Sequence, residues 1–449
     1  MKRYKLLNNV LGWVVFVIAA VTYILTLEST ASFWDCGEFI ASGYKLEVGH
    51  PPGNPIFMLT ARFFANFASS PSEVAYMVNL MSGLLSAATI LLLFWTITRL
   101  AQKIVLREGE TEETMSLGQM IAILGCGLVG ALAYAWSDTF WFSAVEGEVY
   151  AYSSFCTALV FWLILKWESV ADLPHANRYI ILIAYIIGVS IAVHLLNLLC
   201  IPAIVLVYYY RKYKNTDLKG SLIALLVSFV LIVLLLYGLV PGFVEVASWV
   251  ELLFVNVFHL PFNSGVVFYF FLIVGVIAWA IYETYAQRSD KLIKISFLIS
   301  IVLVGIPFIG DGYIIGIVLT AALAYYLFTR KKLAVVAMNT ILLSLFVIFI
   351  GYSSYALIVI RSTANTPMDQ NSPEDIFSLG GYLNREQYGD RPLFYGQTFP
   401  AEIARDANGT AISTKGKAIW KKKLKTSEDE ADRYIAVSYT HLRAHETLS

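Results

Sequence analysis

The chain has 449 residues, of which 58% are hydrophobic and only 14% are charged. Soluble domains carry roughly 25% charged residues, so this composition excludes an ordinary soluble protein and indicates a membrane protein. The formal net charge is zero, which gives no support for a nucleic-acid partner.

Apolar runs of about 20 residues, the length that a helix needs to cross a bilayer, recur along the chain. They predict an all-α polytopic membrane protein with about eleven spans. The predicted spans cover residues 10–27, 76–98, 120–136, 150–165, 179–193, 195–210, 222–239, 266–282, 295–308, 313–328 and 333–358. The pair 295–308 and 313–328 is also compatible with a re-entrant hairpin. Residues 55–67 are apolar but interrupted by Arg62, which predicts an amphipathic or interfacial helix.

Basic residues predict the orientation of these spans. With the N-terminus in the cytoplasm, the outer loops before residue 361 contain only Lys45 and Arg62, whereas the inner loops contain all the other lysines and arginines of that region. The first span follows Lys2, Arg3 and Lys5 without a clear cleavage site, so we expect it to remain uncleaved. The loops 28–71, 137–149 and 241–265 and the tail from Arg361 would then face outward.

The chain changes character at Arg361, after which it is polar and rich in turn signals. We therefore expect a transmembrane module over residues 1–360 and the start of an extracytoplasmic tail over residues 361–436, which this chain does not complete. Residues 437–449 resemble translated sequencing-adapter read-through and are expected to be a sequence artefact.

Two carboxylates follow the first span in the stretch Trp34-Asp35-Cys36-Gly37-Glu38-Phe39. Their spacing of three predicts that both lie on one face of a short helix, close enough to share a ligand. Asp35 is the predicted catalytic base, since a carboxylate at the mouth of a membrane cavity can take a proton from an attacking hydroxyl. Glu38 is predicted to bind the acceptor, orient Asp35 or hold a metal. The alternatives are a helix cap for Asp35 and a salt bridge with Lys45 for Glu38.

Other polar residues of the outer loops are predicted to bind substrate. His50 precedes Pro51 in an extended conformation and could donate to a phosphate or a sugar hydroxyl, although it could equally cap the turn. Glu146 and Glu148 stand among aromatic residues where a helix enters the bilayer. Compensation of the helix dipole is the alternative explanation for these two acids.

Three more candidates lie deeper in the chain. His194 and Asn197 interrupt an apolar run, and polar residues at membrane depth line cavities or pair across helices. Arg361 opens the tail and suits bidentate contact with a phosphate head group, or else anchors the helix at the interface. We predict that all three bind substrate.

The sequence contains no P-loop, dinucleotide-binding fingerprint, zinc spacing or nucleophile elbow. We therefore expect no cofactor and no resident metal, with a divalent ion left open. The four cysteines, Cys36, Cys126, Cys156 and Cys200, predict no disulfide framework.

The outer-loop motifs together resemble bacterial membrane proteins long catalogued as a domain of unknown function and related to protein O-mannosyltransferases, within the GT-C superfamily of glycosyltransferases. The resemblance spans residues 5–400. Its matching pieces are Trp34-Asp35-Cys36-Gly37-Glu38-Phe39, His50-Pro51-Pro52-Gly53-Asn54-Pro55, Glu146-Gly147-Glu148-Val149-Tyr150, His194-Leu195-Leu196-Asn197, Arg361-Ser362 and Asn384-Arg385-Glu386-Gln387-Tyr388-Gly389-Asp390.

This resemblance implies a GT-C helix bundle in the bacterial inner membrane with a periplasmic active face. It implies transfer of a sugar from a polyprenyl-phosphate donor to a protein or glycan hydroxyl, with inversion. Asp35 would be the catalytic base, and Glu38, His50, Glu146 and Glu148 would surround the donor phosphate or the acceptor. Family members continue into a long outer domain that is mostly missing from this sequence.

Two other classes of function remain as alternatives. A lipid or solute transporter, or flippase, would use the polar residues within the membrane as a substrate path, but the sequence shows no inverted repeat. A non-catalytic membrane scaffold would present the outer tail and would not depend on Asp35.

Overall fold

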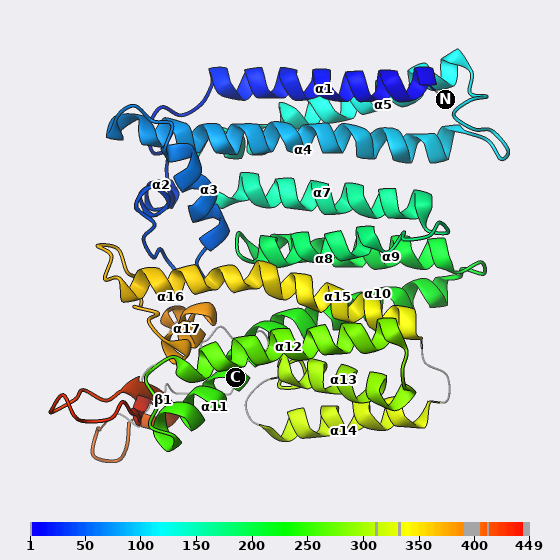
Figure 1. Ribbon diagram of the computed structural model, residues 1–449. Helices are drawn as coiled ribbons and strands as arrows, with labels where there is room; N and C mark the ends of the chain where they lie inside the picture. The colour runs from blue at the N-terminus through cyan, green and yellow to red at the C-terminus, as the bar shows by residue number, and fades with distance from the viewer. Residues whose placement is uncertain (1, 310–312, 331–333, 390–404, 411–412, 443–449) are drawn as a thin grey trace.

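The computed structural model describes residues 2–309, 313–330, 334–389, 405–410 and 413–442. Its long helices lie roughly parallel, and two short helices of the first loop gather at one end of the bundle (Figure 1). The helices are α1 (Lys2–Leu25), α2 (Cys36–Lys45), α3 (Pro55–Ala65), α4 (Val74–Val105), α5 (Leu117–Ala135), α6 (Asp138–Ala144), α7 (Val149–Val170), α8 (Arg178–Ile191), α9 (Ile201–Lys212), α10 (Leu218–Val233), α11 (Val240–Leu252), α12 (Ser264–Ala286), α13 (Asp290–Leu303), α14 (Tyr313–Thr329), α15 (Val335–Tyr352), α16 (Ala356–Thr363) and α17 (Ile376–Leu383).

The prediction of a polytopic all-α membrane protein is confirmed, but the count of about eleven spans is not. Each predicted span falls mainly on helix, but the span 295–308 leaves helix after Leu303 and several other spans end one or two residues beyond a helix. Residue 333 lies outside the described residues. Eight helical segments of the described chain are long and apolar enough to cross a bilayer. Helices α8 and α14 are apolar but have only 14 and 17 residues, fewer than the roughly 20 that a span needs.

The prediction that residues 241–265 form a loop is wrong over most of that range, because α10 continues through a π-helical segment, Leu234–Leu239, into α11. Proline lacks the N–H that continues the hydrogen-bond ladder, so Pro241 would interrupt a regular helix at this place. The π-helical turn directly before Pro241 shifts that ladder, so the helix passes the proline without a break. A second π-helical turn, Leu253–Val257, ends the segment.

Buried apolar side chains form three clusters in the described chain. One joins α1, α4, α5 and α6, and a larger one joins the helices from α7 to α17. The third fixes α2 and α3 against α4, with Phe39, Phe57, Val78 and Met81 at its centre. The short helices of the first loop are therefore packed on the bundle.

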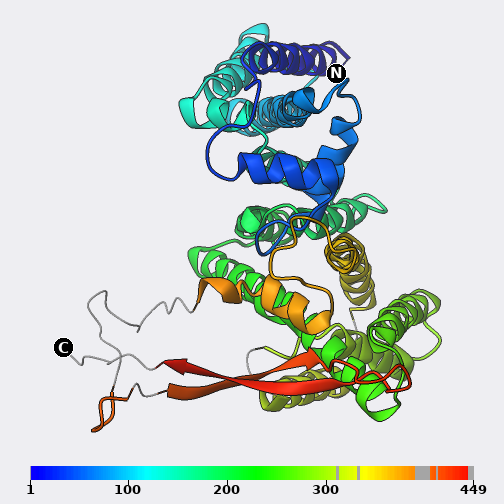
Figure 2. The ribbon, with the colours of Figure 1, turned by 90° about the vertical axis from the view of Figure 1, so that its left-hand side faces the viewer.

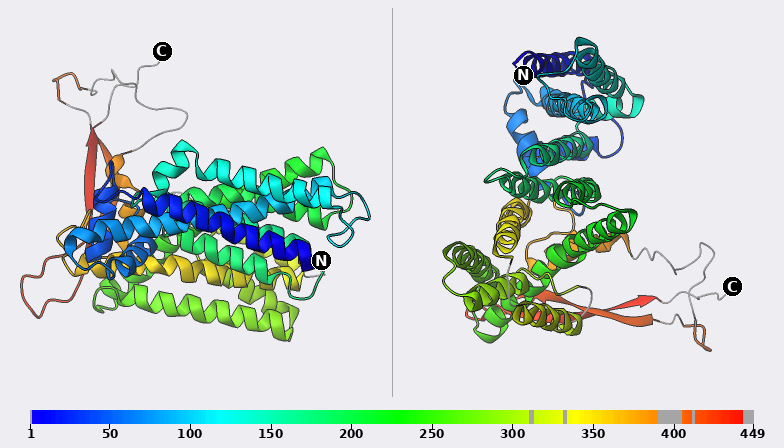
Figure 3. Two further views of the ribbon diagram at one scale, coloured as in Figure 1. Left: turned by 90° about the horizontal axis from the view of Figure 1, so that it is seen from above. Right: turned by 90° about the vertical axis from the view of Figure 1, so that its right-hand side faces the viewer.

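The two strands β1 (Ser413–Lys422) and β2 (Tyr434–Leu442) form an antiparallel hairpin. The hairpin lies across the same end of the bundle as α2 and α17, far from the N-terminal end of α1 (Figures 2 and 3). Tyr434 anchors it, since its backbone N–H donates to the Asn256 side chain at 2.8 Å and its carbonyl accepts from it at 3.0 Å. Whether residues 437–449 are an artefact stays a prediction.

Candidate active site

Four residues from two separate segments meet beside the start of α2. Asp35 occupies the N-cap position, is exposed, and makes no capping hydrogen bond with its side chain. The adjacent Cys36 is buried. Glu146 and Glu148, from the turn before α7, are also buried, at 5% and 6% exposure. We call these four residues the acidic cluster.

Electrostatics shows how closely the acidic cluster is packed. Burial raises the pKa of the Cys36 thiol, and the negative charges of Glu146, Glu148 and Asp35 raise it further. Burial likewise raises the pKa of Glu148 to about 7, with additional contributions from Asp35 and Glu146. Cys36 is therefore a protonated thiol at neutral pH, and Glu148 exchanges its proton in the physiological range.

The turn that carries the two glutamates has little freedom to move. The Glu148 carboxylate accepts from its neighbour's N–H, that of Val149, at 2.8 Å and so caps α7. A Cβ on Gly147 would lie 2.9 Å from Asn79 Oδ1 and 3.1 Å from Ile40. Asn79 in turn donates to the carbonyls of Glu28 and Thr30, which ties the same turn to the loop after α1.

Glu38 faces a different partner from Asp35. Its Oε1 accepts from the backbone N–H of His50 at 2.6 Å and contacts His50 Nδ1 at 2.9 Å. Burial works to raise the pKa of Glu38, but the hydrogen bonds from His50 outweigh it and hold that pKa below its usual value. The same hydrogen bond raises the pKa of His50. The predicted short helix is present, but Glu38 pairs with His50 and not with Lys45.

The turn after His50 is held by the tail. The Tyr382 hydroxyl of α17 donates to Gly49 O at 2.7 Å and to His50 O at 3.3 Å. A parallel bridge joins Val48 to Asp369, and the Gln370 side chain contributes to the lowered pKa of Glu38. Residues 361–389 thus fold back onto the first loop and complete this part of the site.

His194 and Asn197 lie at the same end of the bundle but differ in their contacts. His194 Nδ1 accepts from Leu196 N–H at 3.1 Å, and its ring packs on Tyr150 at a centroid distance of 5.4 Å. Asn197 is fully buried and donates to Ser190 Oγ at 2.8 Å, a hydrogen bond within the packed helices. The structure therefore brings His194 toward the site, whereas Asn197 bonds to a neighbouring helix.

Arg385 is a candidate that we did not predict from the sequence. Its positive charge lowers the pKa of His194, where burial is the main cause, and it also counters the raised pKa of His50. Arg385 is exposed in a left-handed conformation, with φ of 58°, directly before the short helix Glu386–Tyr388. A cation near two imidazoles is suited to bind an anionic group.

Arg361 lies at the opposite end of α2. Its Nε donates to Leu46 O at 2.6 Å, and its Nη2 donates to Lys45 O at 3.4 Å. An α-helix rises 1.5 Å per residue, so ten residues place this contact roughly 15 Å from Asp35. Arg361 is thus separate from the acidic cluster, and its contact with a substrate stays a prediction.

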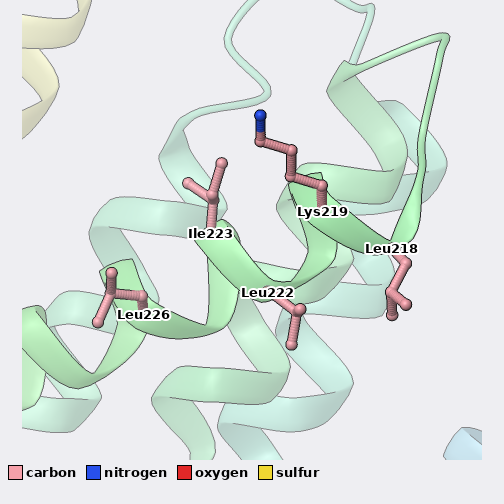
Figure 4. Close-up of a pocket in the computed structure, with 5 residues that line it drawn as sticks. All are labelled: Leu218, Lys219, Leu222, Ile223 and Leu226. Carbon is pink, nitrogen blue, oxygen red and sulfur yellow. The ribbon is translucent and has the colours of Figure 1, made fainter.

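A cavity of about 500 Å³ lies elsewhere, along α10, toward the other end of the bundle from α2. All five side chains that line it, shown in Figure 4, come from that one helix. Leu218, Leu222, Ile223 and Leu226 are exposed there, as expected of a helix face in lipid. We do not include this cavity in the site.

Within the described residues, no group of three or more His, Cys, Asp or Glu side chains is placed to hold a metal. The side chains that the structure brings together at this site can transfer protons and bind anions. Asp35 offers an open carboxylate, Glu148 exchanges a proton near neutral pH, and Arg385 supplies positive charge. The hydrogen bond from Glu38 raises the pKa of His50 and so favours its charged form. This division of tasks suits attack by a hydroxyl on a carbon that carries an anionic leaving group.

Comparison with known proteins relates part of the chain to protein O-mannosyltransferases. Residues 35–217 match the family model described as the Protein O-mannosyl-transferase TMEM260 N-terminal domain. The chain is 27% identical to Protein O-mannosyl-transferase TMEM260 of Mus musculus, over 46% of the chain and 27% of the mouse protein. It is 23% identical to Protein O-mannosyl-transferase tmem260 of Dictyostelium discoideum, over 40% of the chain and 20% of that protein. No solved structure shows a significant match.

The alignments thus span about a quarter of each relative's length. They relate this part of the chain to proteins that are named protein O-mannosyl-transferases. The matched region begins at Asp35 and contains the acidic cluster, Glu38, His50, His194 and Asn197. Arg361 and Arg385 lie outside it.

Proposed function

We propose that the protein is a GT-C-type membrane glycosyltransferase. It transfers a sugar, with inversion, from a polyprenyl-phosphate carrier to a hydroxyl of a protein or glycan acceptor. The reaction takes place on the outer face of a bacterial inner membrane, where α2, α3 and α17 lie. The observation that carries the proposal is the open Asp35 carboxylate beside the buried Glu148, at the start of the region that matches the mannosyltransferase family.

In this mechanism Asp35 takes the proton of the acceptor hydroxyl as its oxygen attacks the anomeric carbon of the sugar. The bond from that carbon to the phosphate oxygen breaks on the opposite face, and the carrier phosphate leaves with the electron pair. A single displacement of this kind inverts the anomeric centre. Asp35 is suited to this task because its carboxylate is exposed and makes no capping hydrogen bond.

The other residues of the site stabilise the charges that the reaction creates. His50, whose pKa is raised by its hydrogen bond to Glu38, and Arg385 place positive charge where the departing phosphate gains negative charge. Glu148, with a pKa of about 7, can stay neutral beside Asp35 and so limits repulsion within the acidic cluster. Glu38 holds the His50 ring and backbone in place through two contacts. His194 packs beside Tyr150 at the rim of this site.

The test is transfer of radiolabelled sugar from a polyprenyl-phosphate-sugar pool to exported protein by the full-length protein. Asp35→Asn should lower transfer by about 100-fold or more, the range expected for loss of a general base. The matched control is Asp138→Asn, since Asp138 is also an exposed carboxylate at the start of a short helix at this end. Equal transfer by the parent and Asp35→Asn would exclude Asp35 as the base. Absence of transfer from a broad donor panel would favour the transporter or scaffold.

A further inference from the structure

Three cationic side chains meet at the C-terminal end of α2. Arg62 of α3 donates from Nη1 to Tyr44 O at 2.5 Å, and its guanidinium lies over the Tyr44 ring. Arg361 of α16 donates to Leu46 O and Lys45 O. Together with the Lys45 side chain they line a cavity of about 390 Å³, whose other walls are Tyr44 and Leu46.

These cations lack compensating acids. In the described part of the chain, no carboxylate lies within 4.0 Å of the charged atoms of Lys45, Arg62 or Arg361. Contact with the last carbonyls of α2 explains part of the arrangement, because the end of a helix carries about half a negative charge. Three positive charges exceed that by far, and the cavity therefore has a net positive character that an anion would neutralise.

The neighbouring surface indicates what kind of anion this is. Helix α3 buries Phe57, Met58 and Ala61 in the bundle. On its other side Leu59, Phe63 and the following Phe67 are exposed by 44%, 58% and 61%. Aromatic and aliphatic side chains beside basic ones are typical of a helix that lies at the headgroup level of a bilayer. A ligand that satisfies both surfaces has an anionic head and hydrocarbon chains.

We propose that the cavity formed by Lys45, Arg62 and Arg361 binds the phosphate monoester head group of a membrane lipid, with the lipid chains against Leu59, Phe63 and Phe67. A monoester carries nearly two negative charges at neutral pH and offers three acceptor oxygens, which suits three cations better than a singly charged diester. This site lies the length of α2, roughly 15 Å, from Asp35. The inference does not depend on the proposed glycosyltransferase activity.

The test uses the full-length protein purified in an uncharged detergent. Binding is measured by the rise in thermal unfolding temperature on titration with phosphatidic acid, phosphatidylglycerol, polyprenyl phosphate or inorganic phosphate. We expect the two lipid monoesters to bind more tightly than phosphatidylglycerol, and inorganic phosphate to bind far more weakly. Inorganic phosphate as effective as the lipids would overturn the lipid assignment, and a preference for phosphatidylglycerol would overturn the monoester assignment.

Variants locate the site. Arg361→Gln and Lys45→Gln should each weaken binding of phosphatidic acid about tenfold, the usual effect of losing one charge-assisted contact. Lys45→Gln should fold as the parent does, because the exposed Lys45 side chain makes no hydrogen bond or ion pair among the described residues. Weaker binding in this variant therefore cannot be attributed to misfolding. The control Lys214→Gln removes an exposed lysine from the loop between α9 and α10 and should bind as the parent does. Unchanged binding in both test variants would reject this cavity.

Discussion

Glu38 Oε1 accepts a hydrogen bond from the His50 backbone at 2.6 Å and contacts the His50 ring nitrogen Nδ1 at 2.9 Å. One carboxylate oxygen thus fixes both the turn and the imidazole of the same residue. Gly49 directly precedes His50, and a Cβ at this position would lie 2.6 Å from Glu38 Oε1. The contact between Glu38 and His50 therefore also requires glycine at position 49. The position of the His50 ring therefore depends on the charge and orientation of Glu38.

Glu38→Gln should destabilise the protein in a pH-dependent way. The pKa of Glu38 is lowered from 4.5, so its contribution to stability exists above pH 4.5 and disappears as the pH falls through the folded-state value. The pKa of His50 is raised from 6.5, so its contribution exists below pH 6.5 and disappears as the pH rises through its folded-state value. The thermal stability lost in Glu38→Gln should therefore be greatest between pH 4.5 and 6.5.

Thermal unfolding of the parent and the variant across pH checks this expectation. Glu245→Gln, which changes an exposed glutamate of α11, serves as the control and should follow the parent at every pH. A constant difference between the parent and Glu38→Gln from acid to alkaline pH would contradict the ion pair.

Glu148→Gln should make the protein more stable at alkaline pH. Burial raises the pKa of Glu148 from 4.5 to about 7, so the folded state favours the protonated form, and stability falls as the pH rises between these values. This difference in pKa between the unfolded and folded states corresponds to about 3 kcal/mol in the free energy of unfolding. Glutamine keeps an oxygen to accept from Val149 N–H but carries no charge. Unfolding temperatures above pH 7 should be higher for the variant, and the two proteins should converge near pH 4.5.

The sequence predicted much of this arrangement because its signals are local. Apolar runs located the helices, and the spacing of three between Asp35 and Glu38 predicted the short helix α2. Glu146 and Glu148 lie beside Cys36 because the turn at Gly147 packs against Asn79. No local sequence pattern reveals this tertiary contact. Arg385 belongs to one of the motifs that carry the resemblance, but nothing in the local sequence predicts that its side chain lies at the site. It comes near His50 and His194 only because the tail folds back and pairs with Val48.

Gly147→Ala tests whether that turn positions the acidic cluster. The new Cβ would lie 2.9 Å from Asn79 Oδ1 and 3.1 Å from Ile40 and Val78, so the turn must shift. Overpacking of this kind costs about 1–3 kcal/mol, and we expect sugar transfer to fall more than stability alone explains. The control is Gly125→Ala on α5, where a Cβ meets nothing within 4 Å and alanine should stabilise the helix slightly. A variant as stable and active as the parent would show that the turn is not confined.

Arg385→Gln should weaken use of the lipid-linked donor while leaving the fold intact. The Arg385 side chain is exposed and its charge acts on both His50 and His194, so its loss should raise the pKa of both imidazoles and remove one cation from the proposed phosphate site. We expect kcat/KM for the donor to fall about tenfold, which corresponds to one charge-assisted contact. The pH profile should also shift to higher pH, an effect that a purely structural role would not produce. Arg433→Gln, another exposed arginine of the tail, is the control. A fall in kcat/KM with an unchanged pH profile would show that Arg385 acts without influencing the two imidazoles.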